Sequence, residues 1–137
     1  MHPLYSKANS LTHDVISAAI EVQNHFGTGL LESIYVKCLA RELSLRGYKT
    51  AREKPVSISY KGLEFSEKLF VDLLVEDCLV IEAKAVVPGA GDIGVFRAQT
   101  LSYLKLLDLP LGLIINFHNP RLGKAGVRRV ILKGADK

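Results

Sequence analysis

Apolar residues in the first third of the chain recur at helical spacing. From Leu11 to Phe26 they fall every three or four positions, as on a helix with one buried face, and Ser10 or Thr12 can cap its start. Glycines at 27 and 29 break the pattern, which resumes over Leu31–Gly47 and ends on glycine, the usual residue just beyond a helix. The pattern therefore predicts two helices in succession.

The period changes to two after the second helix, as it does in strands. Polar and apolar residues alternate over Val56–Tyr60, and Lys61-Gly62 is a turn signal. Two short apolar runs, Leu69–Val75 and Leu79–Val86, are joined at Glu76-Asp77. These runs predict a hairpin in the middle of a sheet.

Breaks and apolar runs also divide the second half of the chain. The elements expected there, in order, are a loop at 87–91, a helix capped by Asp92 that ends before Pro110, a strand at 111–117, a turn at 118–120 and an edge strand at 127–132. The whole order predicts a single α/β domain over residues 1–137 with a mixed sheet. The first three strands can form an antiparallel meander, and the crossover through the third helix returns the fourth strand to the same sheet.

Composition supports a folded domain and excludes several classes of protein. With 137 residues, 48% hydrophobic and 23% charged, the chain can bury one core and is neither disordered nor a coiled coil. Its apolar stretches are too short to span a membrane, and its first residues lack the apolar segment of a secretory signal, so we expect a cytoplasmic protein. Cys38 and Cys78 show no metal-ligand spacing and are expected to be buried and free.

The charge balance allows a polyanionic partner without requiring one. The chain carries 18 Lys and Arg against 14 Asp and Glu, a net charge of +4. Basic residues gather toward the end of the chain, where they form either a surface for a phosphate backbone or a solvated face that keeps the protein soluble. They are Arg121, Lys124, Arg128, Arg129, Lys133 and Lys137.

Three charged residues interrupt the apolar strands of the predicted hairpin. Asp72 lies in the first strand, and Glu82 and Lys84 lie in the second. Charges in central strands are costly unless they are paired, bound to a cation or open to a solvent-filled cleft. Alternation places Glu82 and Lys84 on one face of their strand, with Ala83 facing the other way.

The position of Asp72 depends on the length of the turn. A two-residue turn would point Asp72 away from Glu82, whereas a three-residue connection or a bulge would place it directly opposite, and we predict the latter. Two opposed carboxylates need a divalent cation between them or a bridge from Lys84. The hairpin alone leaves both interpretations open: a metal site, or an internal ion pair without chemistry.

A third acid stands in the first turn of the second helix, and with it the chain resembles a known family. Glu32 is one of the acids that the helix dipole favours at that position. The segment Gly29–Tyr35 matches the signature GxxExxY, and Asp72 followed by Glu82-Ala83-Lys84 resembles the D…ExK core of the PD-(D/E)xK nuclease superfamily. The chain is thus similar to the GxxExxY family, small bacterial and archaeal proteins within that superfamily. Two further parallels are Ala98–Leu104 and Leu113–Phe117.

The chain departs from the family pattern at two places. Val71 stands where the superfamily name has proline, a change that is chemically harmless. Phe96 and Arg97 stand where relatives often have a histidine before the alanine-glutamine pair, and this change weakens the case for activity.

The resemblance implies a restriction-endonuclease-like αβββαβ core with a mixed central sheet flanked by helices. It implies a Mg²⁺ or Mn²⁺ site made by Glu32, Asp72, Glu82 and the backbone carbonyl of Ala83, because hard cations prefer oxygen ligands. A water activated by the metal would hydrolyse phosphodiester bonds of DNA, or secondarily of RNA. Besides the metal-binding acids, the implied catalytic residues are Lys84, which stabilises the hydroxide or the transition state, and Gln99, which orients a water or a phosphate oxygen.

Further expectations concern packing, nucleic acid and assembly. Tyr35 is expected to pack in the interior, with its hydroxyl orienting Glu32. Because a domain this small covers little nucleic acid, we also expect a homodimer. The residues expected to contact the phosphate backbone are Arg97, Lys105, Arg121, Lys124, Arg128 and Arg129.

Two other functions remain open at the level of sequence. One is a catalytically weak or inactive module with the nuclease fold that binds nucleic acid or a protein partner. The other is a structural protein in which the acids and Lys84 form an ion-pair network, which would leave excess negative charge buried.

Overall fold

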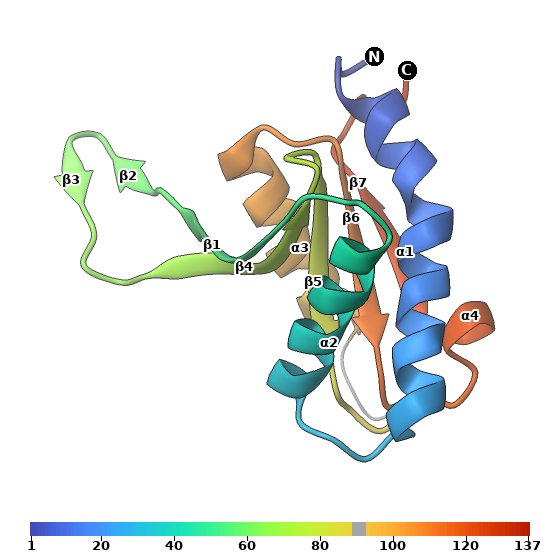
Figure 1. The fold of residues 1–137 in the computed structure, drawn as a ribbon. Helices are drawn as coiled ribbons and strands as arrows, with labels where there is room; N and C mark the ends of the chain where they lie inside the picture. Colours follow the sequence, from blue (N-terminus) through green and yellow to red (C-terminus); the bar gives the residue numbers. More distant parts are fainter. Residues whose placement is uncertain (89–92) are drawn as a thin grey trace.

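The computed structural model describes residues 1–88 and 93–137, which form the helices and strands labelled in Figure 1. The expected loop at 87–91 lies partly, and the expected cap Asp92 wholly, outside the described residues. The elements are α1 (Tyr5–Phe26), α2 (Glu32–Leu45), β1 (Thr50–Val56), β2 (Ser59–Tyr60), β3 (Leu63–Glu64), β4 (Leu69–Val75), β5 (Leu79–Lys84), α3 (Ile93–Leu107), β6 (Leu111–Asn116), α4 (Leu122–Ala125) and β7 (Val127–Ile131).

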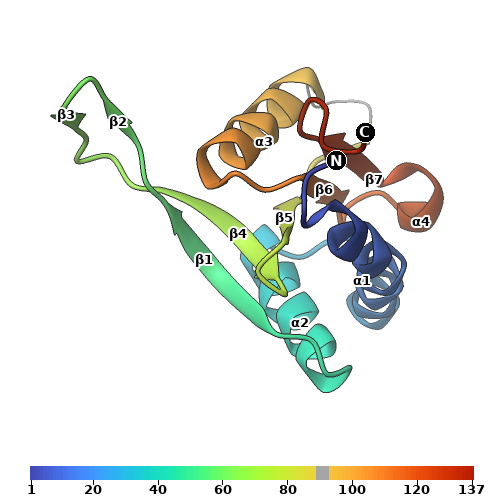
Figure 2. The ribbon, with the colours of Figure 1, turned by 90° about the horizontal axis from the view of Figure 1, so that it is seen from above.

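Five strands form one mixed sheet in the order β1-β4-β5-β6-β7. Strands β1, β4 and β5 are antiparallel neighbours, β6 lies parallel to β5, and β7 closes the far edge antiparallel to β6. Helices α1 and α2 cover one face of the sheet, and α3 covers the other (Figure 2). The predicted crossover helix and edge strand are therefore confirmed. An antiparallel meander is also present, but its first strand is β1, which replaces the strand predicted over Val56–Tyr60. None of the helices in the described part of the chain is both long and apolar enough to span a membrane.

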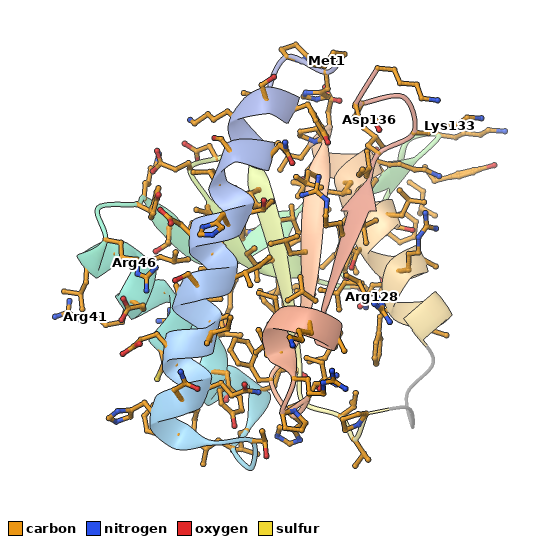
Figure 3. The ribbon with its side chains drawn as sticks, turned by 90° about the vertical axis from the view of Figure 1, so that its right-hand side faces the viewer. Met1, Arg41, Arg46, Arg128, Lys133 and Asp136 are labelled. Carbon is orange, nitrogen blue, oxygen red and sulfur yellow. The ribbon has the colours of Figure 1, made fainter. Side chains whose placement is uncertain are left out.

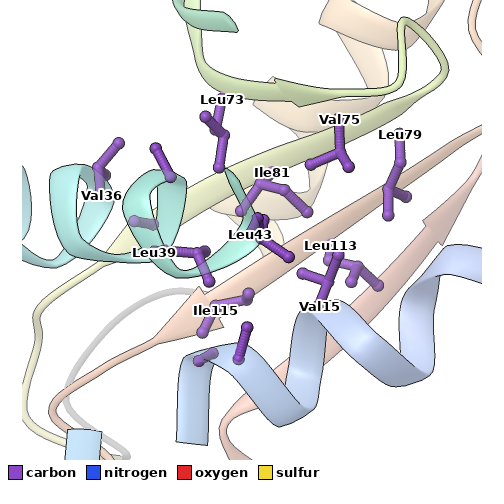
Figure 4. Close-up of a cluster of buried hydrophobic side chains, with 14 of the residues drawn as sticks. Val15, Val36, Leu39, Leu43, Leu73, Val75, Leu79, Ile81, Leu113 and Ile115 are labelled. Carbon is purple, nitrogen blue, oxygen red and sulfur yellow. The ribbon is translucent and has the colours of Figure 1, made fainter. Parts of the chain in front are cut away.

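The larger core lies between the sheet and helices α1 and α2. Figure 4 shows Leu39 and Leu43 of α2 and Val15 of α1 packed against Ile81 and Leu113 of the central strands. A smaller cluster, which includes Leu104 and Val80, lies beneath α3. Along β5 the side chains alternate between the two cores, so the α3 face is the one that receives the polar residues near the end of this strand.

Helix α1 begins earlier than the sequence pattern predicted. It starts at Tyr5 instead of Leu11, and no side chain caps it. The hydroxyls of Ser10 and Thr12 instead donate to carbonyls one turn back within the helix. Ala8, which is fully buried, extends the apolar face of α1 toward the N-terminus. The residues around it are polar, so the helical spacing of apolar positions could not be recognised there from the sequence.

The single strand predicted over Val56–Tyr60 is divided in the structure, because Val56 ends β1, Ser59 and Tyr60 form β2, and the two residues between them belong to neither strand. Strand β1 ends at Val56, which is buried, and the chain then leaves the sheet to form the separate hairpin β2–β3. The predicted turn at Lys61-Gly62 is confirmed, with both residues at positive φ. Figure 1 shows β1 and β4 carrying this hairpin away from the body of the protein. The alternation of polar and apolar residues therefore continues into a segment that is not packed against the helices of the main domain. The single-turn helix α4 was not predicted.

Candidate active site

The candidate site begins where the ladder between β4 and β5 ends. Val75 pairs with Leu79, so the connection between the strands has three residues, and two of them, Glu76 and Asp77, adopt positive φ angles of 50° and 57°. The last pair in the ladder is Leu73 with Ile81, and the same register places the next residues, Asp72 and Glu82, opposite each other. The prediction of a three-residue connection is confirmed.

Beyond the last ladder pair, hydrogen bonds from backbone N–H groups to the two carboxylates replace the hydrogen bonds between backbone groups of the two strands. The backbone N–H of Asp72 donates to Glu82 Oε1 at 3.2 Å, and the backbone N–H of Ala83 donates to Asp72 Oδ2 at 2.8 Å. Each carboxylate is thus anchored to the opposite strand through one oxygen. The second oxygen of each group can accept from or bind another partner.

Burial raises the pKa of both acids, and the charge of Asp72 raises that of Glu82 further. Glu82 is only 3% exposed, and burial followed by the charge of Asp72 raises its pKa to about 8. Burial also raises the pKa of Asp72, although the hydrogen bond from Ala83 and the charge of Lys84 act in the opposite direction. A proton or a cation is therefore needed to stabilise this pair near neutral pH.

Glu32 approaches the pair from the start of α2. Burial raises the pKa of its carboxyl, the charge of Lys84 lowers it, and the charge of Asp72 raises it further. Glu32 and Asp72 line one pocket of about 270 Å³ together with Glu53 of β1. Glu53, whose charge also raises the pKa of Asp72, was missed in the sequence because β1 itself was not predicted.

Tyr35 fixes the loop that precedes Glu32. Its hydroxyl donates to the carbonyl of Gly27 at 2.6 Å and accepts the backbone N–H of Leu30 at 3.1 Å. Its ring is fully buried and stacks on Phe117 with centroids 4.6 Å apart. Tyr35 packs as predicted, but its hydroxyl binds the loop backbone and does not bind Glu32 directly.

Lys84 lies on the α3 face of β5, as the alternation predicted. Its Nζ is 4.8 Å from the centroid of the Phe96 ring, while Ala83 is buried against the opposite core. Among the ion pairs of the described residues, none joins Lys84 to Asp72 or Glu82. This part of the chain therefore lacks the internal ion-pair network that was one alternative.

Helix α3 adds a residue that the sequence did not single out. Burial, Glu82 and Asp72 all raise the pKa of Tyr103, whose hydroxyl therefore lies within reach of the acid pair's charge. The exposed side chain of Gln99, one helical turn before Tyr103, acts in the opposite direction and lowers this pKa. Gln99 is thus linked to the acids through Tyr103, and the spacing of four residues on one helix was the signal available in the sequence.

The donor set fits a hard divalent cation held mainly by two carboxylates. In residues 1–88 and 93–137, no group of three or more His, Cys, Asp and Glu side chains is close enough to form a complete metal cage. Mg²⁺ does not require such a cage, because it usually keeps several waters and is held by one or two carboxylates and substrate phosphates. Asp72 and Glu82, anchored side by side with raised pKa values, match that requirement.

The predicted phosphate-contacting residues are divided between two sides of the protein. Arg97 and Lys105 are exposed on α3, and Arg128 lines a pocket together with Lys84 (Figure 3 labels Arg128 beside β7). Arg121 and Lys124 lie at α4 against α1. Arg129 donates to Asn9 Oδ1 of α1 at 2.8 Å. The structure therefore places Arg97, Lys105 and Arg128 on the same side of the protein as Lys84. The other three predicted residues lie elsewhere.

Comparison with known proteins gives one result. Residues 9–130 match a family model described as the PD-(D/E)XK nuclease superfamily. No curated protein and no solved structure matches the chain.

Proposed function

Since this chain belongs to the PD-(D/E)XK nuclease superfamily, we propose that it is a Mg²⁺- or Mn²⁺-dependent nuclease that hydrolyses phosphodiester bonds of DNA in preference to RNA. Within that superfamily we assign it to the GxxExxY family. The observation that carries the proposal is the pair Asp72 and Glu82, fixed opposite each other beside a lysine that neither acid neutralises through an ion pair in the described residues.

Four groups of the chain would hold the cation. Asp72 and Glu82 supply carboxylate oxygens, the backbone of Ala83 supplies a carbonyl, and Glu32 lines the adjoining pocket from α2. When bound, a divalent ion of this kind lowers the pKa of a water and offsets charge on the leaving oxygen.

The other residues act on the phosphate and on water. Lys84 carries a compact charge with three donors and stabilises negative charge that develops in the transition state. Gln99, one helical turn before Tyr103 on α3, orients a water or a phosphate oxygen. Arg97, Lys105 and Arg128 are the predicted backbone contacts on this side of the protein, where they fix the position of the strand without reading its sequence.

A second candidate function is a nuclease-fold module with little activity that binds nucleic acid or a protein partner. One observation favours it: Phe96, one of the two residues that stand where relatives often have a histidine, holds the Lys84 ammonium over its ring. Such a contact stabilises the cation but competes with its approach to a phosphate.

Metal titration distinguishes a nuclease from an inactive module and requires no assumption about the substrate. We expect Mn²⁺ and Mg²⁺ to bind saturably to the wild type in calorimetry, and Asp72→Asn to abolish this binding. Asp77→Asn is the matched control, because Asp77 lies in the adjoining turn and pairs with Lys49 at 2.8 Å. Metal-dependent cleavage of DNA by the wild type, absent in Asp72→Asn, would establish the nuclease. Binding of nucleic acid without metal binding or cleavage would establish the inactive module.

We also propose that the protein is a homodimer. The hairpin β2–β3 exposes apolar side chains away from the body of the protein, with Tyr60 51% and Leu63 60% exposed. Sedimentation equilibrium should give twice the chain mass at micromolar concentration. A monomer mass across a wide concentration range would contradict the dimer.

A further inference from the structure

A second pocket lies at the carboxyl ends of the parallel strands β5 and β6, where open α/β sheets commonly bind ligands. It measures about 260 Å³. Lys84 connects it to the candidate active site, because its charge acts on the acids while its side chain lines this pocket.

The described lining of this pocket carries positive charge without an acid. Its two cationic residues are Lys84 and Arg128, and no Asp or Glu contributes to the described lining. The guanidinium of Arg128 has no ion pair or side-chain hydrogen bond within the described part of the chain. The next residue, Arg129, is bound to Asn9 of α1 on the other side of β7. Two neighbouring cations with no acid in the described wall favour an anion such as a phosphate group.

The remaining wall of the pocket suits a flat ring. It is largely apolar, with Val86 and Ile114 beside the Phe96 ring, and Asn119 adds an amide at the rim. The side-chain oxygen of Asn119 accepts the backbone N–H of Arg121, which leaves its NH₂ group able to donate outward. The volume is slightly below the range of about 300–1,000 Å³ that drug-sized ligands fill, so the pocket suits one heterocyclic ring and its attached phosphate.

We propose that this pocket binds one nucleotide of the substrate strand, with the phosphate held by Lys84 and Arg128 and the base against Phe96 and the apolar wall. This inference rests on the proposed nuclease function and narrows its substrate. A base can enter such a pocket only when it has left the stacked duplex, and this costs least where the base is unpaired. The preferred substrates are therefore single strands, frayed ends or mismatched positions.

Binding of a mononucleotide tests the pocket directly. We would titrate the wild type and its variants with 2′-deoxyadenosine 5′-monophosphate and with inorganic phosphate, in a chelator so that no metal–phosphate contact contributes. Arg128→Ala should weaken both ligands at least tenfold. Ala125→Phe should weaken only the nucleotide, because Ala125 is an exposed residue of the pocket wall and the larger ring fills the space for the base. Arg129→Ala is the matched control and should change neither affinity.

Two results would overturn the proposal that this pocket binds a nucleotide. In the first, the nucleotide binds to the wild type no more tightly than inorganic phosphate. In the second, Arg128→Ala and Arg129→Ala change the affinities equally. These outcomes leave the proposed function standing if Asp72→Asn still abolishes metal binding and cleavage. Conversely, if the protein binds no metal but shows the expected nucleotide affinities, the proposed nuclease function is contradicted and the proposed nucleotide pocket is supported.

Discussion

Asp72 and Glu82 face each other at the end of the β4–β5 ladder, with the backbone N–H of Asp72 bound to the Glu82 carboxylate at 3.2 Å. The neighbouring amide of Ala83 binds Asp72 in return. These two hydrogen bonds hold two acidic side chains close together in the interior, so neither side chain can turn away to reduce the electrostatic repulsion between them. The pair is therefore stable only when a proton or a cation reduces its charge.

The first prediction concerns stability against pH in the absence of metal. The pKa of Glu82 rises from 4.5 to about 8 on folding, so the native state binds this proton more tightly than the unfolded chain. Its contribution is fully present below pH 4.5 and is lost as the pH rises through about 8. The raised pKa of Asp72 acts in the same direction. Urea unfolding in a chelator should show the free energy of unfolding falling by up to about 1.4 kcal/mol for each pH unit between these two values.

Glu82→Gln isolates this effect, because glutamine keeps the shape of the side chain without a charge. The variant should show a flatter profile and be more stable than the wild type at about pH 9, above the raised pKa. Glu67→Gln, which changes an exposed acid before β4, should follow the wild type. Parallel profiles for wild type and Glu82→Gln would contradict the raised pKa.

A second prediction separates catalysis by Lys84 from a structural role. Lys84→Ala should lower the rate of cleavage by roughly 10²–10³, the usual cost of removing a group that stabilises transition-state charge. Metal binding and the unfolding midpoint should change little, since Lys84 forms no ion pair with the acids in the described residues. Lys61→Ala in the β2–β3 turn is the control. Loss of the folded state in Lys84→Ala would instead show that Lys84 is needed for folding and would contradict a purely catalytic role.

Tyr103 and Gln99 give a third prediction, in the form of a double-mutant cycle. Gln99 lowers the pKa of Tyr103, and the charges of Glu82 and Asp72 raise it, so we expect Gln99 and Tyr103 to act as a unit. Tyr103→Phe and Gln99→Ala should each reduce the cleavage rate, and the double variant should lose little more than either single one. Rates should be compared together with melting temperatures. Additive losses would show that the two side chains act independently.

Patterns over short stretches of sequence predicted part of the candidate site, once a three-residue connection was chosen over a two-residue turn. Three residues between Val75 and Leu79 set the register that opposes Asp72 to Glu82, and alternation alone placed Lys84 on the α3 face. Helix periodicity likewise placed Glu32 at the start of α2. These features depend on the backbone over short stretches, where the periods of helix and strand are reliable.

Features that depend on contacts across the fold were not predictable in this way. Tyr103 looked like one more apolar helix position until α3 was packed beside the acids. The alternation over Val56–Tyr60 gave no sign that Val56 is covered while Tyr60 projects into solvent. Sequence pattern shows which residues can share a face, but not whether another layer covers it.

The last prediction concerns the loop that positions Glu32. The Tyr35 hydroxyl bridges Gly27 and Leu30, so Tyr35→Phe leaves a carbonyl and an amide of this loop without their partner. The free energy of unfolding should fall by about 1 kcal/mol, the net contribution of a typical hydrogen bond, because Gly27 is exposed and Leu30 is only partly buried. Because the loop leads into the first residue of α2, the variant should also bind Mn²⁺ more weakly in calorimetry. Tyr60→Phe, at an exposed tyrosine of β2, should change neither quantity. Reduced stability with unchanged metal affinity would show that Tyr35 holds the loop without positioning Glu32 for the metal.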